Sequence, residues 1–223
     1  MRTASRTVLI VLNIGAALLF ATVAHGQASV PRSAPGKTIF RDSDGVLISN
    51  NEFVDIRMAN FTYPDATLVK ASDDGTVEFR LQKVPQEGMR AADFTVTTLD
   101  GRTIRSADLK GKVVVLNFWF IGCPVCRAIK PKLNELETKF AGNENVIFLA
   151  ITADPAGAVR KYIEKEPFTY LQATDSKAVL DEFVFAGFPK NIVVSKTGEI
   201  VYWRSTIRAW DKFESVIRRE LER

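Results

Sequence analysis

The only two cysteines of this 223-residue chain lie in the sequence Cys123-Pro124-Val125-Cys126. Two residues between cysteines at the start of a helix let both sulfurs lie on its first turn, close enough for a disulfide. Unpaired backbone N–H groups and the helix dipole favour a thiolate at Cys123, which lowers its pKa and makes it the nucleophile. Cys126, expected to lie deeper, would then resolve a mixed disulfide on Cys123. The spacing predicts thiol–disulfide exchange.

Two other uses of the cysteine pair stay open. A structural disulfide between residues so near in sequence would restrain little of the unfolded chain. The pair would also serve as half of an intermolecular zinc site. Pro124 is suited to the first helical position, where its missing N–H costs nothing. Redox chemistry is the preferred interpretation over both alternatives.

The segments around the cysteines alternate between strands and helices. Continuous apolar runs at 113–119 and 146–152 are typical of strands buried on both faces. Asp154 and Pro155 predict a helix start, with Asp154 as the N-cap and the helix running to about Lys165. Further helices are expected over 124–140, 177–185 and 209–221. This order predicts an α/β fold with a central mixed sheet flanked by helices.

Turn residues divide the rest of residues 38–223 into hairpins. Strands are expected at 67–71 with 76–84, at 93–98 with 102–104, and at 191–195 with 199–203. Before the first hairpin, a short helix is predicted over Asn50–Ala59. Ser49 would be its N-cap, and Glu52 would reach back to complete a capping box. Residues 38–87 thus form a small strand-containing extension ahead of the main domain at 88–223.

Residues 88–222 resemble the thioredoxin superfamily, in particular the extracytoplasmic TlpA/ResA-type thiol–disulfide oxidoreductases of the redoxin (AhpC/TSA) group. The motifs that carry the resemblance are Ala92-Asp93-Phe94, Leu99-Asp100-Gly101, the segment 109–119, the Cys-Pro-Val-Cys sequence, Pro131 and Gly187-Phe188-Pro189. The resemblance implies a thioredoxin fold in which Pro189 is a cis-proline facing the disulfide. The backbone of Phe188 would pair with a substrate strand there, although the pattern alone also fits an ordinary trans turn proline.

Several positions depart from the family pattern. Val125 and Pro124 differ from the residues of thioredoxin, so the redox direction stays open. Asn117 replaces a buried aspartate of thioredoxin, and Ile129 replaces a buried glutamate of ResA-like proteins. No buried general base for Cys126 is evident, and water or a residue of another loop, such as Glu164 or Asp175, would have to serve.

Two aromatic residues before Cys123 add to this picture. Phe120 stands where peroxiredoxins, which share the fold, need a threonine, and this argues against a peroxidase. Trp119 lies four residues before Cys123, where it is expected either to pack in the core or to lie beside the disulfide. Together with Phe188, Pro189, Pro124 and Val125, it belongs to the predicted supporting residues of the site.

The N-terminus has the pattern of a secretory signal. A basic start, an apolar run over 8–24 and the small residues Ala24 and Gly26 predict a signal peptide over 1–26, cut before Gln27. An uncleaved membrane anchor is the alternative, because the run is at the short limit of a membrane span. Residues 27–37 read as a flexible lead-in. The protein is therefore expected to be periplasmic or secreted, or anchored in the membrane by this segment.

Composition excludes several classes of function. The formal charge of +4 falls to +2 without the two arginines of 1–26, and no basic stripe is present, which argues against nucleic acid as a partner. The single histidine, His25, lies inside the predicted signal, so a mature chain has none for a catalytic triad or a metal site. No metal, nucleotide or organic cofactor is expected beyond the Cys123–Cys126 disulfide.

The expected function is reduction of protein disulfides, with a membrane or periplasmic electron donor restoring the dithiol. A disulfide oxidase or isomerase of the same fold is the runner-up, because Pro124 is also the first residue between the cysteines of DsbA-type oxidants. A different class is a redox-silent thioredoxin-like platform in which 38–87 is a binding module. The oligomeric state does not follow from the sequence.

Overall fold

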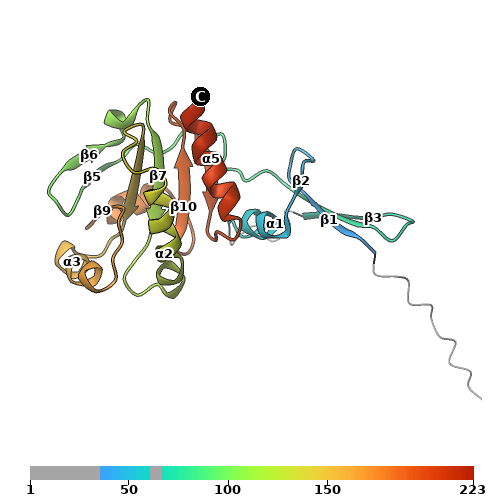
Figure 1. Cartoon of the computed structure of the whole chain (residues 1–223), viewed down its shortest axis with the longest axis horizontal. Helices are drawn as coiled ribbons and strands as arrows, with labels where there is room; N and C mark the ends of the chain where they lie inside the picture. The colour runs from blue at the N-terminus through green and yellow to red at the C-terminus, as the bar shows by residue number, and fades with distance from the viewer. Residues whose placement is uncertain (1–35, 61–66) are drawn as a thin grey trace, which may run out of the picture. The chain divides into compact units, whose positions relative to one another are not determined.

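The structure is a computed structural model that describes residues 36–60 and 67–223 (Figure 1). The predicted signal peptide and all but the last two residues of the predicted lead-in lie outside these ranges. Within them, no helix is both long and apolar enough to cross a bilayer.

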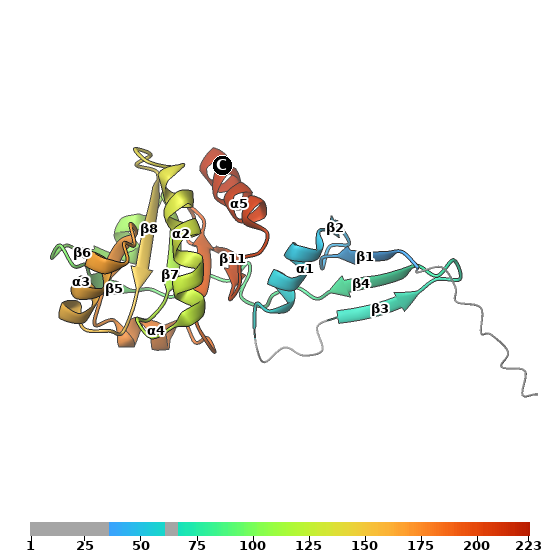
Figure 2. The same cartoon turned by 60° about the horizontal axis from the view of Figure 1, so that its bottom comes forward.

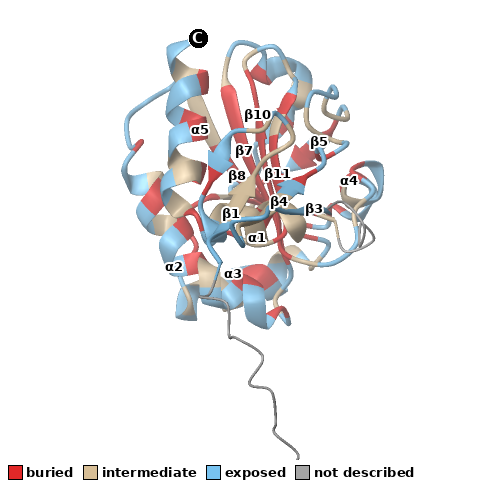
Figure 3. Ribbon diagram, turned by 90° about the vertical axis from the view of Figure 1, so that its right-hand side faces the viewer, coloured by how far each residue is buried: buried red, intermediate tan, exposed pale blue. Residues whose placement is uncertain are grey.

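A mixed five-stranded sheet forms the centre of the main domain, in the order β11-β10-β7-β8-β9. Its strands are β7 (Val113–Phe118), β8 (Val146–Ile151), β9 (Leu171–Ala173), β10 (Lys190–Val194) and β11 (Ile200–Arg204). β7, β8 and β9 run parallel, whereas β10 is antiparallel to both β7 and β11. Every residue of β7 and β10 is buried, as Figure 3 shows in red. The predicted mixed α/β fold is confirmed.

Helices pack on both faces of this sheet. They are α2 (Pro124–Thr138), α3 (Ala156–Lys165), α4 (Lys177–Glu182) and α5 (Trp210–Glu222). Leu133 of α2, Val159 of α3 and Phe213 of α5 belong to one core cluster with Val115, and Figure 2 shows α2 lying against β7 and β8. Val179 of α4 belongs to a second cluster on the opposite face. Burial of both faces explains the unbroken apolar runs in the central strands.

The smaller sheets lie earlier in the chain. In the extension, β1 (Thr38–Arg41), β2 (Leu47–Ile48), β3 (Thr67–Ala71) and β4 (Val77–Leu81) form a sheet in the order β2-β1-β4-β3, next to α1 (Asn50–Arg57). The main domain adds the hairpin β5 (Thr95–Thr97) and β6 (Thr103–Arg105) and the short helix η1 (Ser106–Leu109). The rings of Phe40, Phe53 and Phe79 stack in the extension, with centroids 4.5–5.9 Å apart.

Two sequence predictions about helices were wrong. Asp154 is not the N-cap of α3, which begins at Ala156 after Pro155, because the Asp154 carboxylate binds the backbone of another loop. The helix predicted over 177–185 ends at Glu182. Val184 has a left-handed backbone conformation, with φ of 40°, which no helix accommodates.

The capping box of α1 is formed only in part. Ser49 is the N-cap, and its Oγ accepts the Glu52 N–H at 3.1 Å, as predicted. The Glu52 carboxylate instead makes an ion pair with Lys212 of α5 at 2.9 Å. The side chain that was expected to close the box thus links the extension to the main domain.

Candidate active site

Cys123 and Cys126 form a disulfide at the first turn of α2, with their Cα atoms 5.3 Å apart. Cys123 is the N-cap of the helix, and its Sγ accepts the backbone N–H of Cys126 at 3.1 Å. Pro124 occupies the first helical position, as predicted. The expectation that Cys126 lies deeper was wrong for this oxidised form, because Cys123 is 4% and Cys126 6% exposed. The N-terminal N–H groups, rather than exposure, favour Cys123 as the thiolate.

The loop between β7 and the disulfide is held by Asp154, which lies in the loop after β8. The Asp154 carboxylate accepts the Ile121 N–H at 2.7 Å and the Thr152 hydroxyl at 2.9 Å. A Cβ at Gly122 would lie 3.1 Å from the ring of Phe120, so a larger residue in this loop would have to displace that ring slightly. Sequence reasoning missed this role of Asp154, which no local pattern marks.

The peptide bond between Phe188 and Pro189 is cis, as the resemblance implied. The antiparallel register pairs Lys190 with Phe118, so Pro189 lies at the end of β7 from which the disulfide loop departs. A trans turn proline is therefore ruled out. The pairing of the Phe188 backbone with a substrate strand stays a prediction.

Apolar side chains are exposed around this end of the sheet. Val125, between the two cysteines, is 48% exposed, and Phe120 is 39% exposed. The ring of Phe120 meets that of Phe188 edge-on, with centroids 5.2 Å apart. Exposed apolar groups of this kind suit contact with a polypeptide rather than with a small polar molecule.

Trp119 has the core role, one of the two roles left open by the sequence. It is 2% exposed and belongs to the same core cluster as both cysteines. Its ring lies against Tyr162 and Phe168, with centroids 5.5 and 5.7 Å away. Trp119 is thus a core residue, and a role beside the disulfide stays a prediction.

An ion cluster flanks the helix that carries the disulfide. Lys130 is buried, and its Nζ donates to the Glu166 carboxylate and the Tyr162 hydroxyl, each at 3.0 Å. Arg127, directly after Cys126, lies 3.3 Å from the same carboxylate. The hydrogen bonds from Lys130 and Tyr162 lower the pKa of Glu166, so it stays ionised and is a poor proton acceptor.

The structure offers no buried carboxylate beneath the cysteines among the residues it describes. Asn117 is 2% exposed and donates to the Asn191 Oδ1 at 2.8 Å. Of the predicted candidates, Glu164 is exposed, and Asp175 accepts the Ala156 N–H at the start of α3. Neither residue is therefore assigned as the proton acceptor for Cys126.

Comparison with known proteins places this site in a family. The model of the AhpC/TSA family matches residues 88–203. This chain belongs to the AhpC/TSA family. Within that family it is similar to thiol-disulfide oxidoreductase ResA of Bacillus thuringiensis, at 32% identity over 118 residues, which cover 52% of this chain and 68% of that protein. The resemblance to TlpA/ResA-like members of the thioredoxin superfamily is confirmed.

Other thioredoxin-like proteins are also similar to this chain in sequence or in structure. Thioredoxin-like protein YneN of Bacillus subtilis is 29% identical over 117 residues, which cover 52% of this chain and 69% of that protein. The thioredoxin domain of a thiol-disulfide oxidoreductase from Bacteroides vulgatus superposes with a TM-score of 0.53 at 28% identity. That superposition covers 59% of this chain and 97% of the other. All of residues 38–87 lie before the stretch matched by the family model.

Proposed function

We propose that this thiol–disulfide oxidoreductase works outside the cytoplasm and reduces disulfides in protein substrates. The observation that carries the proposal is the Cys123–Cys126 disulfide at the N-terminus of α2. The names of its relatives support the reaction class, and the signal pattern at 1–26 supports the location. Two sulfurs exchange the two electrons of a disulfide, so the proposed reaction needs no metal or organic cofactor.

The reduced form starts the reaction. The Cys123 thiolate attacks one sulfur of the substrate disulfide, and the other substrate sulfur leaves as a thiolate and takes up a proton. Cys126 then loses its proton and attacks Cys123 Sγ, which releases the second substrate sulfur and forms the disulfide seen in the structure. Two electrons pass to the substrate, and an external thiol donor, at the membrane or in the periplasm, returns two to the pair.

The N-cap geometry favours the first step. The Cys126 N–H that points at Cys123 Sγ stabilises a negative charge on that sulfur. Exposed Val125 and Phe120 provide apolar contact for the substrate polypeptide. The backbone of Phe188, directly before Pro189, would pair with an extended substrate segment.

Insulin reduction with dithiothreitol as electron source tests the activity. The wild-type protein is expected to accelerate insulin precipitation, and Cys123→Ala is expected to abolish the acceleration. Cys126→Ala is expected to accumulate a mixed disulfide that a non-reducing gel resolves. Equal rates of insulin precipitation for the wild type and Cys123→Ala would contradict the proposed enzymatic activity. They would favour a redox-silent binding module.

The direction is tested by the reduction potential of the pair, measured in glutathione and dithiothreitol buffers. A value near or below about −250 mV, toward thioredoxin, supports the reductase. A value near about −150 mV or above, toward DsbA, would identify an oxidase or isomerase instead.

A further inference from the structure

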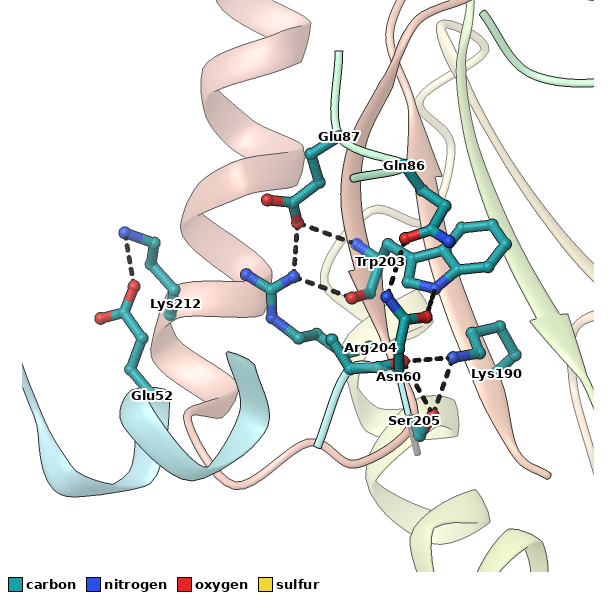
Figure 4. A network of polar contacts seen from close by, with 10 residues as sticks. Glu52, Asn60, Gln86, Glu87, Lys190, Trp203, Arg204, Ser205 and Lys212 are labelled. Atoms are coloured by element: carbon teal, nitrogen blue, oxygen red, sulfur yellow. Dashed lines mark hydrogen bonds and ion pairs between the residues drawn. The ribbon is translucent and has the colours of Figure 1, made fainter. Parts of the chain in front are cut away.

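Lys190, the first residue of β10, places an ammonium group in a fully buried position directly after Pro189. Its side chain is 0% exposed. Its Nζ donates to the carbonyl oxygen of Ala59 at 2.6 Å and to Ser205 Oγ at 2.7 Å (Figure 4). It also lies 5.0 Å from the centroid of the Trp203 ring. A backbone carbonyl, a hydroxyl and an aromatic face thus hold this cation.

Burial of this ammonium is unfavourable by itself. Burial lowers the pKa of Lys190 to about 7, and repulsion from Arg204 adds to the shift. Arg204 in turn pairs with Glu87. An apolar side chain of similar length would fill the space without this cost. Packing alone therefore does not account for a lysine next to the cis-proline.

The principal acceptor of Lys190 comes from the N-terminal extension. Ala59 follows α1 and is 1% exposed. The next residue, Asn60, accepts the Trp203 Nε1–H at 2.9 Å and donates to Gln86 Oε1 at 2.9 Å (Figure 4). These bonds fix the Ala59 carbonyl beside β10 and β11, so the extension meets the main domain directly behind the cis-proline.

Aromatic rings connect this network with the exposed surface beside the disulfide. The Trp203 ring lies 6.4 Å from that of Phe185, and Phe185 lies 5.4 Å from Phe188. Phe188 then contacts the exposed Phe120 at 5.2 Å. Because such rings are closely packed, a shift of one requires a shift of its neighbour.

We propose that Lys190 is a positioning residue for substrate, and that the extension, through the Ala59 carbonyl, sets the Phe188–Pro189 segment for pairing with a disulfide-bearing polypeptide. The inference rests on the proposed function. Lys190 projects from the same face of β10 as Ile192, into a different core cluster from the cysteines, so it acts through its neighbour Pro189.

Two substrates distinguish this role from a general structural one. Insulin carries its disulfides on polypeptide chains, whereas 5,5′-dithiobis(2-nitrobenzoic acid) has no backbone to pair. The pre-reduced protein is mixed with each, and loss of its two thiols is followed in a single turnover. In Lys190→Met, the half-saturating insulin concentration is expected to rise about 10-fold, with the limiting rate within about twofold. The rate with the small disulfide and the reduction potential are expected to stay unchanged.

Lys196→Met is the matched control. Lys196 also donates to a backbone carbonyl, that of Leu221 at 2.7 Å, but it follows the far end of β10. This control is expected to react with both substrates like the wild type. An equal loss with both substrates in Lys190→Met, or no loss with either, would overturn the positioning role. A wild-type protein that reacts with neither would instead refute the proposed function.

Ser205→Ala provides a milder variant in case Lys190→Met does not fold. It removes one acceptor of Lys190 and leaves the Ala59 carbonyl in place. The half-saturating insulin concentration is expected to rise about threefold, with no change for the small disulfide. Its control is Ser215→Ala. This change removes an exposed hydroxyl of α5 that donates to the Lys212 carbonyl oxygen. Identical behaviour of Ser205→Ala and the wild type would count against the proposal.

Discussion

The carboxylate of Asp154 accepts the backbone N–H of Ile121 at 2.7 Å, two residues before Cys123. The bond crosses from the loop after β8 to the loop after β7, and Thr152 holds the same carboxylate. Asp154 therefore controls the path of the chain into the N-cap of α2.

Asp154→Ala should slow insulin reduction about 5–10-fold and lower the free energy of unfolding by about 1–3 kcal/mol, because the Ile121 N–H loses its acceptor. Rates and urea denaturation measure the two effects. Asp181→Ala, which breaks only an exposed ion pair with Lys177, is the control and should change neither by much. A normal rate in Asp154→Ala would show that the loop keeps its path without this acid.

Asp55 of the extension binds the backbone of the main domain just before α5. Its carboxylate accepts the N–H groups of Arg208 and Ala209 at the start of α5, and the Thr206 hydroxyl. Asp55→Ala should lower the free energy of unfolding by about 2–4 kcal/mol, since three donors lose their acceptor and the buried Ala209 N–H is left unpaired. Urea denaturation tests this against Asp73→Ala in an exposed turn. Equal stability of the two variants would contradict an integrated extension.

Lys190 should make stability depend on pH. Its pKa is lowered to about 7 in the folded protein from 10.5, so between these values the unfolded chain binds more protons. The free energy of unfolding therefore gains a contribution as pH rises from about 7 toward about 10. Urea midpoints at pH 7, 8 and 9 should show this rise in the wild type relative to Lys190→Met. Parallel curves would mean that Lys190 stays protonated when folded.

Asn117→Asp should restore a buried acid on the face of β7 that carries the cysteine cluster. Burial raises the pKa of such a carboxyl, so folding stability should fall as pH rises above about 4, by about 2–4 kcal/mol at pH 8. Resolution of the mixed disulfide by Cys126 should accelerate where the new group is ionised. Stopped-flow release of substrate thiol measures this. Asn145→Asp, on the exposed surface, is the control; a similar response in both variants would place Asn117 away from the reaction.

The sequence by itself determined the local features of this protein. The spacing of Cys123 and Cys126 and the placement of Pro124 predicted the helix start, because caps and first turns depend on neighbouring residues. Unbroken apolar runs predicted β7 and β8, since burial on both faces leaves no alternation. The three-residue strand β9 was too short to give such a pattern, and it was missed.

Only the tertiary structure decided which polar groups meet across the fold. Asp154 reads as a helix cap from its neighbours, yet it binds Ile121 across 33 residues. Lys190 directly precedes the predicted strand 191–195 and carries no local signal, yet it is buried against Ala59, 131 residues away. Local patterns set the preferences of a segment, whereas the partner of a buried polar group depends on which segments pack together. The cysteine pair, β7 and the start of α2 could thus be found in the sequence, and the long-range polar contacts only in the fold.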